Sequence, residues 1–364
     1  MIYQLNRYVI QAYKYRFNSC SNSKKKKLVQ VLLYQQPYKH IYLIQAMASL
    51  NFSKFQNNIL DKNGEQIKIG FGVGSYWRIY KSEHKVNFVP ELVEQLKTAI
   101  KSGFKMLDGA EAYNTYEEIG AALKETGVKR EDIWITDKYL TKSYDLRGST
   151  GPIDSLNRAL GLMDLDYVDM YLLHTPTITK ENAGITLEEA WEQCEKLVEL
   201  GKAKQIGVSN FRVEDLERIM KVCKIKPMCN QIEFHPYLQS QSPGIREYCY
   251  SNGIQIEAFS VLTPLTKCGD DPIENPIIPI VEKLSKKYGK TNSQILLRWS
   301  TQLGILALTT TSNAERIKQS LEIFDFELTK EELIEIINTK DAKFFRGWGK
   351  DFMPYTQEEC NVGL

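Results

Sequence analysis

Short apolar segments alternate with longer amphipathic segments along the chain from residue 69 to residue 321. Apolar runs of about four to eight residues are typical of buried strands, and apolar positions spaced three and four apart are typical of helices. The pattern predicts strands over 69–73, 104–108, 133–138, 167–174, 203–208, 227–232, 254–259 and 304–309. It predicts helices over 90–102, 115–125, 152–162, 186–200, 213–221, 243–252, 275–288, 291–302 and 314–321. Eight strands in strict alternation with helices predict an α/β fold, a closed (β/α)8 TIM barrel of parallel strands.

The first 46 residues differ in composition from the rest of the chain. Residues 1–60 contain nine Lys and Arg and no acidic residue, with a run of lysines at 24–27. We expect residues 1–46 to be a disordered or non-native leader, with translation starting at Met47, and residues 47–364 to be a single barrel domain. A mitochondrial transit peptide is the main alternative, although such peptides favour Arg and Ser over Lys. An amphipathic segment on a membrane surface is the third.

Composition and charge exclude several classes of function. The chain is 43% hydrophobic and 25% charged, and no apolar run approaches the roughly 20 residues that span a bilayer. The formal net charge is +2, so nothing indicates a nucleic acid or a membrane as partner. The seven cysteines form no Cys-x-x-Cys pair, and the four histidines show no zinc-type spacing. We therefore expect reduced thiols, no metal site and a cytoplasmic protein, or a mitochondrial one if residues 1–46 are a transit peptide.

The glycine-rich segment Ile69-Gly-Phe-Gly-Val-Gly74 invites comparison with a dinucleotide-binding fingerprint. Its glycine spacing differs from that fingerprint, and we expect no helix directly after it because residues 75–81 are aromatic and basic. We attribute the glycines to close approach of backbones instead. Before them, Asn51–Phe55 and Glu65–Ile69 flank the turn sequence Asp-Lys-Asn-Gly, which predicts a β-hairpin.

Polar residues close several predicted strands at the end where barrel enzymes have their active site. Asp108 closes one strand and Tyr113 lies in the following loop, while Lys138 and His174 close the next two strands. A tyrosine with a pKa near 10 is a poor acid at neutral pH, and a cation beside it favours the phenolate. Each residue alone is more often structural. The four together predict a catalytic site.

The remaining strand ends carry polar and aromatic side chains that can bind a ligand, and Thr311 and Ser312 among them offer hydroxyl donors for a phosphate. These side chains are Ser209, Asn210, Gln231, Phe259, Ser260, Thr310, Thr311 and Ser312. The first three offer the hydroxyl and amide groups that hold a carboxamide ring in one orientation, and Phe259 offers a flat face for stacking. His235 lies beyond its strand in a turn, and we interpret it as structural.

Five segments resemble the aldo-keto reductase family, and the resemblance covers about residues 50–345. They are Leu-Asp-Gly-Ala-Glu-Ala-Tyr, Ile-Thr-Asp-Lys, Asp-Met-Tyr-Leu-Leu-His-Thr-Pro, Ile-Gly-Val-Ser-Asn-Phe and Asn-Gln-Ile-Glu-Phe-His-Pro-Tyr, in the family's order. The resemblance places the family's catalytic tetrad on Asp108, Tyr113, Lys138 and His174. It places the nicotinamide-binding Ser, Asn and Gln on Ser209, Asn210 and Gln231. It implies NADPH as cofactor, bound extended across a barrel without a Rossmann fingerprint.

Departures from the family pattern concern the cofactor and the substrate. Phe259 stands where many members stack a Tyr on the nicotinamide, and Thr310 replaces a usual lysine partner of the 2′-phosphate. Arg316 still matches the family's 2′-phosphate arginine. The segment Leu-Asp-Gly-Ala-Glu with Ser75-Tyr-Trp is most similar to a branch of yeasts and filamentous fungi that reduces 2-oxo carbonyl compounds, such as ketopantoyl lactone, and related ketones. The resemblance implies that residues 75–85, 141–151 and 344–364 select the substrate, and that the C-terminal tail lies over the active face of the barrel.

The reaction that the resemblance implies is hydride transfer from a nicotinamide to a small-molecule aldehyde or ketone. Tyr113 is expected to protonate the oxygen, with its pKa lowered by Lys138, while Asp108 holds the lysine and His174 orients the carbonyl. The alternative is a catalytically silent, nucleotide-binding relative that acts as a redox-sensing subunit. The intact set of four residues argues against it. A metal-assisted hydrolase has less support still, because no His-x-His closes the first strand.

Overall fold

The structure is a computed structural model that describes residues 59–141 and 148–361. Eight parallel strands pair in chain order, and the last pairs with the first, so that they close a barrel. The strands are β1 (Ile69–Gly72), β2 (Met106–Asp108), β3 (Trp134–Tyr139), β4 (Val168–Leu173), β5 (Ala203–Ser209), β6 (Cys229–Glu233), β7 (Gln255–Phe259) and β8 (Leu306–Thr309). The predicted (β/α)8 barrel is confirmed. The leader over 1–46, the start at Met47 and the strand over 51–55 lie outside the described residues.

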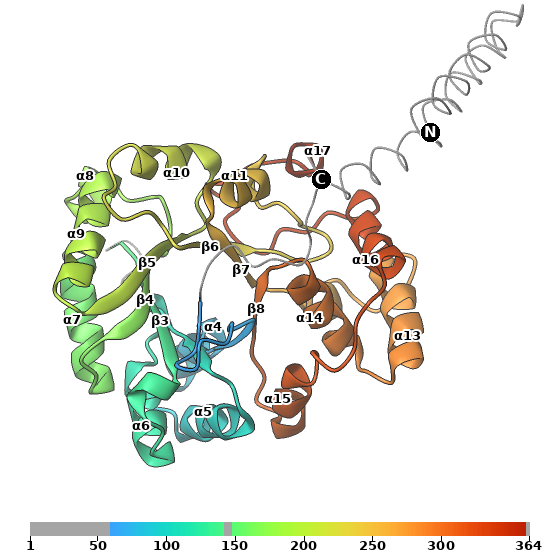
Figure 1. Cartoon of the computed structure of the whole chain (residues 1–364), viewed down its shortest axis with the longest axis horizontal. Coiled ribbons are helices and arrows are strands. Elements are labelled where there is room, and N and C mark those ends of the chain that lie inside the picture. The colour runs from blue at the N-terminus through green and yellow to red at the C-terminus, as the bar shows by residue number, and fades with distance from the viewer. Residues whose placement is uncertain (1–58, 142–147, 362–364) are drawn as a thin grey trace, which may run out of the picture. The chain divides into compact units, whose positions relative to one another are not determined.

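Helices surround the strands and cover the outer wall of the barrel (Figure 1). The principal ones are α5 (Pro90–Ser102), α6 (Tyr116–Thr126), α7 (Pro152–Met163), α9 (Leu187–Glu199), α10 (Val213–Met220), α11 (Ile245–Asn252), α13 (Ile277–Tyr288), α14 (Asn292–Gln302) and α15 (Ala314–Leu321). Pro90 starts α5 with a fixed helical φ, and Gly103 ends it at a φ of 112° that favours glycine. Short helices α8 (Lys180–Ala183) and α12 (Thr263–Thr266) and the turns η1 (Glu111–Tyr113) and η2 (Arg130–Asp132) lie in the connections.

A β-hairpin closes the barrel at the end where the strands begin. Its turn is held by Asp61, whose Oδ1 accepts hydrogen bonds from the backbone N–H groups of Asn63 (2.8 Å) and Glu65 (3.0 Å). Ile59 and Ile67 on its two arms join a buried cluster. That cluster contains Met106, Trp134, Cys229 and Leu306, the first residues of β2, β3, β6 and β8. The carboxyl ends of the strands are therefore left free at the other end.

The glycine-rich segment from Ile69 to Gly74 contains β1, and a helix, α4 (Ser75–His84), follows it directly, contrary to expectation. Aromatic residues one turn apart stack on this helix, with the rings of Tyr80 and His84 4.0 Å apart. Lys81 is drawn into the interior by Glu118 of α6, at 2.7 Å. The prediction of no helix was wrong, although the fingerprint spacing is still absent. Gly70 is required for packing, since a Cβ there would lie 2.6 Å from the sulfur of Met106.

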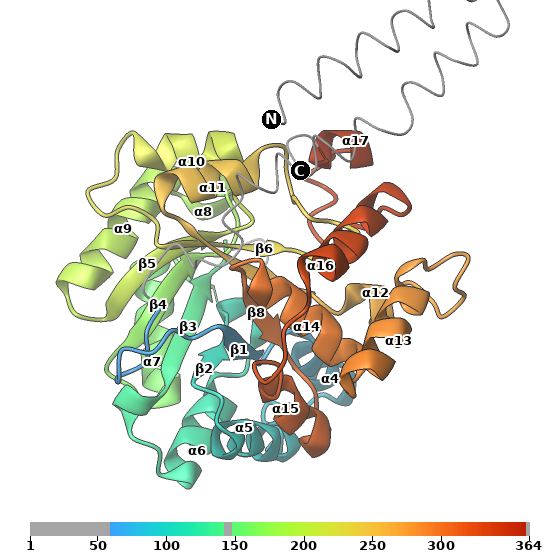
Figure 2. The ribbon, with the colours of Figure 1, turned by 45° about the vertical axis from the view of Figure 1, so that its right-hand side comes forward.

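The segment after residue 321 contains more regular structure than its polar and aromatic composition indicates. It includes α16 (Lys330–Ile337), η3 (Asn338–Asp341) and α17 (Gln357–Cys360). Thr329 caps α16 and exchanges hydrogen bonds with Glu332, a capping box that is visible in the sequence. Figure 2 shows α16 beside α14 and α13 on the barrel wall.

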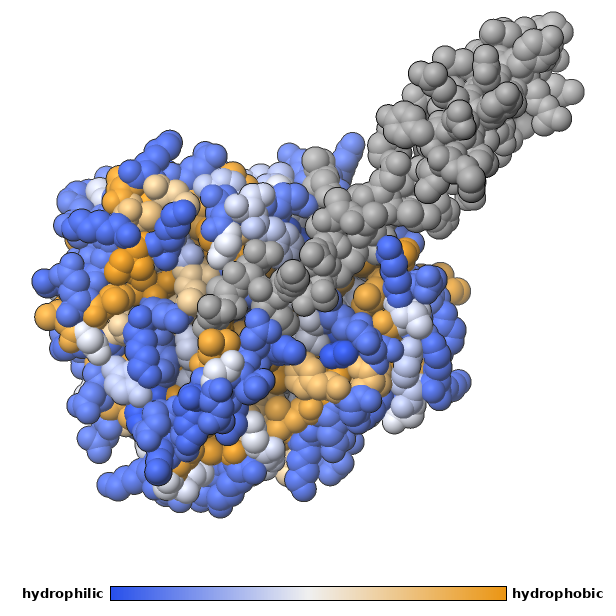
Figure 3. Space-filling view, in the orientation of Figure 1, coloured by the Kyte–Doolittle hydropathy of each residue, from blue (hydrophilic) through white to orange (hydrophobic). Residues whose placement is uncertain are grey.

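The face in Figure 3 is mostly hydrophilic, with apolar patches scattered between charged side chains. Within residues 59–141 and 148–361, no helix has both the length and the apolar character needed to cross a membrane.

Candidate active site

The four predicted catalytic residues meet at the open end of the barrel. Asp108 is the last residue of β2, Lys138 lies next to the end of β3, and His174 directly follows β4. Tyr113 ends the short turn η1, which returns from β2 toward the barrel. The parallel register places Lys138 opposite Leu172 of β4, so the carboxyl ends of neighbouring strands lie at one level. Four residues from different parts of the sequence therefore form one cluster at the open end of the barrel.

Lys138 is fully buried at the centre of the cluster. Its ammonium group donates hydrogen bonds to Asp108 Oδ2 (2.7 Å) and to the carbonyl of Gly109 (2.8 Å). Its Nζ also lies 5.2 Å from the centre of the Tyr113 ring. Burial alone would lower the pKa of Lys138, but the charges of Asp108 and its neighbours outweigh burial and raise it. Lys138 therefore stays positively charged at every working pH.

Tyr113 is half-buried, and its ring meets the His174 ring edge-on at 5.8 Å. Removal of the hydroxyl from water raises the pKa of Tyr113, and Lys138 lowers it by less, so the pKa lies above its ordinary value. Lys138 thus acts on this pKa in the expected direction, but burial outweighs it and keeps the pKa above its ordinary value. The phenol is held in its protonated form, which is the form a general acid needs.

His174 is neutral in this site. Burial and the charge of Lys138 both lower the pKa of its imidazole well below the ordinary value. Its Nδ1 is buried and has no hydrogen-bond partner among the described residues. A buried N–H without an acceptor is rarer than an unsatisfied acceptor, so we assign the proton to Nε2. His174 then presents an N–H donor to a ligand in the barrel mouth.

The three predicted carboxamide-binding residues form one hydrogen-bonded group beside the tetrad. Ser209 Oγ donates to the carbonyl of Gln231 (2.8 Å), and Asn210 Nδ2 donates to the carbonyl of His174 (3.0 Å). Gln231 Nε2 donates to Asp108 Oδ1 and to Glu257 Oε2, both at 2.9 Å. Because two carboxyl groups take the amide N–H2, the amide oxygen of Gln231 is the atom left for a ligand. Burial raises the pKa of Glu257 to about 7.

An aromatic residue that the sequence did not single out also lies at the site. The Trp348 ring is 6.3 Å from His174 and nearly parallel to it, at 11°, and it meets Phe259 edge-on at 6.2 Å. Phe259 and His174 thus share Trp348 as a neighbour, and Ser260 follows Phe259 with a left-handed φ of 63°. No sequence pattern indicates which aromatic residue of the C-terminal segment returns to the barrel.

The predicted phosphate-binding residues form a separate group after β8. Gln95 of α5 donates to Thr310 Oγ1 (3.4 Å) and to the Thr311 carbonyl (2.9 Å), which holds this loop. Ser312 is exposed next to it. Arg316 is exposed at the start of α15, and its guanidinium makes no hydrogen bond or ion pair with other described residues, while its backbone N–H donates to Asn313 Oδ1. No hydrogen bond within the described residues joins this group to the tetrad.

A second buried carboxyl group, that of Asp137, lies on the outer side of β3. Burial raises its pKa to about 7, and the Tyr116 hydroxyl donates to its two oxygens at 3.0 and 3.1 Å. A folded-state pKa above the unfolded value near 3.9 means that its contribution to stability is complete below about pH 4 and is lost as the pH rises through 7.

Asp137→Asn should therefore stabilise the protein more at pH 8 than at pH 5, because the amide cannot ionise. We expect the gap in urea midpoint between variant and wild type to widen over that interval. Asp132→Asn removes a partly exposed carboxylate, paired with Lys62 just before β3, and is the control that should show no widening. Equal gaps at both pH values would show that Asp137 is ionised in the folded protein.

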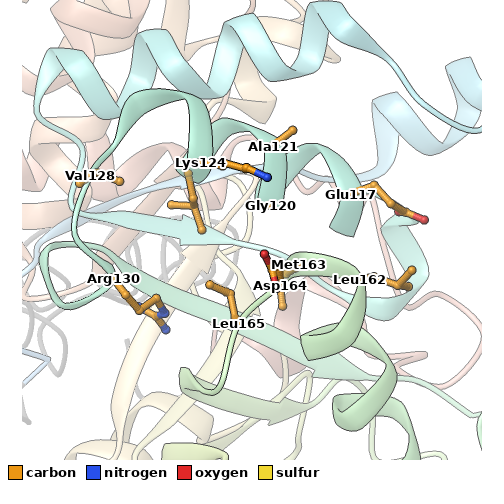
Figure 4. Close-up of a pocket in the computed structure, with 11 residues that line it drawn as sticks. Glu117, Gly120, Ala121, Lys124, Val128, Arg130, Leu162, Met163, Asp164 and Leu165 are labelled. Carbon is orange, nitrogen blue, oxygen red and sulfur yellow. The ribbon is translucent and has the colours of Figure 1, made fainter.

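A hollow of about 400 Å³ lies on the outer wall between α6 and α7 (Figure 4). A Cβ at Gly120 would lie 2.6 Å from the Met163 carbonyl, so the two helices are in close contact there. The charge of Arg130 in its wall is paired with Asp169 at 2.7 Å. None of the predicted site residues lines this hollow. Within residues 59–141 and 148–361, no group of three His, Cys, Asp or Glu is placed to hold a metal ion.

Comparison with known proteins places these observations in a family. The model of the aldo/keto reductase family matches residues 68–340. The chain is 46% identical over 276 residues to the NADPH-dependent alpha-keto amide reductase of Saccharomyces cerevisiae, covering 75% of this chain and 88% of that protein. It is 35% identical to the NAD/NADP-dependent indole-3-acetaldehyde reductase of Schizosaccharomyces pombe, covering 73% and 89%. The crystal structure of a Bombyx mori aldo-keto reductase in complex with NADP matches with a TM-score of 0.66 and 27% identity, covering 83% and 98%.

Proposed function

The chain belongs to the aldo/keto reductase family, and we propose that its barrel mouth reduces a 2-oxo carbonyl compound with the tetrad as catalytic machinery. It is an NADPH-dependent oxidoreductase that acts on an aldehyde or ketone. The observation that carries the catalytic proposal is the fully buried Lys138–Asp108 pair beside Tyr113 and His174. The alternative of a catalytically silent subunit gains no support from relatives that are named as reductases.

Each member of the tetrad has a proposed role that follows from its surroundings. Tyr113 donates the proton to the carbonyl oxygen, since its raised pKa keeps the phenol protonated. Lys138 stabilises the phenolate that forms, and Asp108 holds Lys138 in place at 2.7 Å. His174 donates from Nε2 to the same oxygen and so fixes the angle of the carbonyl.

The cofactor fits the donor and acceptor groups that the chain presents. NADPH supplies the hydride when bound. Ser209, Asn210 and the amide oxygen of Gln231 are proposed to orient its carboxamide, and Phe259 to stack on the ring. Ser260, Thr310, Thr311, Ser312 and Arg316 are proposed to hold the remaining, phosphate-bearing part. Arg316 supports this assignment because it is exposed and its guanidinium makes no hydrogen bond or ion pair with other described residues.

Two observations support the proposed substrate class, namely the name of the yeast relative and the aromatic side chains near the tetrad. The yeast relative is named for alpha-keto amides, and Trp348 and Phe259 offer flat surfaces near the tetrad. A panel of 2-oxo amides, 2-oxo esters, lactones and simple aldehydes, assayed by NADPH absorbance, tests the class. Faster turnover of simple aldehydes than of every 2-oxo compound would contradict it.

Arg316→Ala should raise the Michaelis constant for NADPH roughly tenfold, because a charge-assisted hydrogen bond to the 2′-phosphate is lost. The constant for NADH should change little, since NADH lacks that phosphate. Lys318→Ala is the matched control, because Lys318 is exposed on the same helix. Equal effects on the two cofactors would contradict the role of Arg316.

The cellular setting is also proposed. Cys194, Cys223, Cys229, Cys249, Cys268 and Cys360 are all free thiols. Free thiols fit a reducing compartment, so we propose a cytoplasmic enzyme, or a mitochondrial one if residues 1–46 direct import. We also propose that residues 47–364 form one catalytic domain.

A further inference from the structure

The segment Phe345–Met353, here called the tail segment, runs from η3 toward α17 along the open end of the barrel. Its first residue, Phe345, donates a backbone hydrogen bond to the Tyr237 carbonyl beyond β6 (3.4 Å). Farther on, Tyr355 reaches Glu214 of α10 (3.4 Å). Trp348 in the middle of the segment lies between these two attachments and beside the tetrad.

A buried carboxylate holds the backbone of the tail segment directly at Trp348. Glu233, the last residue of β6, is 1% exposed. Its Oε1 accepts from the backbone N–H of Gly347 (2.8 Å), and its Oε2 accepts from that of Trp348 (3.0 Å). His235 Nε2 lies 3.2 Å from the same Oε1 and steadies the carboxylate. Hydrogen bonds to an ionised acceptor are among the stronger ones in proteins.

Gly347 is the residue that lets this contact form. A Cβ at position 347 would lie 2.9 Å from Glu233 Oε1, closer than side-chain carbons approach an oxygen. Any other residue would therefore force the carboxylate or the tail segment to shift and would disturb this contact. The glycine and the glutamate act as one clamp between positions that are 114 residues apart.

A second anchor joins the tail segment to the cofactor side of the site. Arg346 is buried, and its Nη2 donates to the carbonyl of Gln241 (2.8 Å). The side chain of Gln241 donates in turn to Asn210 Oδ1 (2.9 Å). Arg346, Gly347 and Trp348 are thus held one after another by hydrogen bonds, which fixes the backbone from which the indole projects.

The fixed indole forms a flat wall beside the reacting group. Its ring lies 6.3 Å from His174, nearly parallel to it, and 6.2 and 5.3 Å from Phe259 and Phe352, edge-on to both. Trp348 is still 36% exposed, so part of the ring faces open space. An aromatic surface held in one place favours a flat substituent over a small or a flexible one.

We propose that Glu233 is a positioning residue that holds Trp348 as a wall of the substrate site, and that this wall selects carbonyl compounds bearing an aromatic group next to a 2-oxo acyl unit. The inference rests on the proposed function for its substrate class. The clamp itself rests only on the contacts of Glu233.

The clamp can be tested without any substrate. The other four tryptophans, Trp77, Trp134, Trp191 and Trp299, are at most 8% exposed, so acrylamide quenching of fluorescence reports mainly on Trp348. Glu233→Gln places an amide N–H2 group against one of the two backbone N–H groups, so one hydrogen bond of the clamp is lost. The quenching constant of Trp348 should therefore rise. Gly347→Ala should do the same from the other side of the clamp. Trp348→Phe identifies the accessible signal. Glu214→Gln removes a charge that contacts Tyr355 (3.4 Å) and Arg212 (3.0 Å) at the surface, away from Glu233, and should leave quenching unchanged.

The specificity is tested with ethyl benzoylformate and methylglyoxal as substrates. Glu233→Gln and Trp348→Leu should each lower kcat/KM for the aromatic ester about tenfold, through KM, while kcat/KM for methylglyoxal changes less than about threefold. The double variant should lose no more activity toward the aromatic ester than either single variant, because both changes remove the same wall.

Equal losses of kcat/KM for the two substrates would contradict the proposal that Trp348 selects aromatic substrates. Unchanged quenching in both Glu233→Gln and Gly347→Ala would contradict the clamp. If wild type reduces neither substrate, the proposed substrate class fails and quenching alone decides the clamp.

Discussion

Replacement of Tyr113 by Phe should lower the rate of carbonyl reduction at least about a hundredfold, the smallest usual contribution of a general acid. Phe keeps the ring that meets His174 edge-on at 5.8 Å and lies 5.2 Å from Lys138 Nζ. Only the hydroxyl is lost, so the affinity for NADPH should stay within about twofold of wild type. Initial rates and titration of NADPH against protein fluorescence measure the two quantities separately.

Tyr116→Phe is the matched control for this experiment. Tyr116 is a buried tyrosine of α6, three positions along the chain, whose hydroxyl donates to Asp137 outside the barrel. Its loss should cost stability of about 1–3 kcal/mol, because a buried acceptor loses its donor, and should leave turnover nearly unchanged. A Tyr113→Phe variant that keeps more than about a hundredth of wild-type activity would show that another group supplies the proton.

The barrel was predictable because its signal is local. Apolar strands, Pro90 at the start of α5 and Gly103 at its end can all be read from short windows of sequence, and the structure has them where they were predicted. Helix α4 was missed because contacts with residues distant in the sequence stabilise it. Its Lys81 is buried by Glu118, which comes 37 residues later. Helix α16 could have been found from its capping box at Thr329.

The catalytic cluster was predictable for a geometric reason. Parallel strands bring their carboxyl ends together, so Asp108, Lys138 and His174 had to lie near one another once the barrel was inferred. Glu233 also ends a strand, yet its role depends on Gly347 and Trp348, whose return to the barrel has no local signal. Strand-end patterns find residues of the scaffold. They do not find the residues of a segment that folds back over it.

Lys138→Met should abolish turnover and also destabilise the fold, and the two effects can be separated. Methionine has a similar length but no charge, so Asp108 keeps its hydrogen bond from Gln231 (2.9 Å) and loses its buried cation. A buried carboxylate left without its partner costs about 3–5 kcal/mol. The variant should show that loss in urea denaturation, together with a fall in kcat of at least about a hundredfold.

The double variant Asp108→Asn with Lys138→Met separates stability from catalysis. It removes both charges at once, so most of the lost stability should return while kcat stays at least about a hundredfold below that of wild type. Residual alcohol oxidation with NADP+ gives a further readout, because this direction needs the phenolate of Tyr113. Lys138 lowers the pKa of that phenol against the effect of burial. Without Lys138 the pKa rises further, so the acid limb of the oxidation profile should move to higher pH. An acid limb that stays in place would mean that Lys138 acts only through the stability of the barrel.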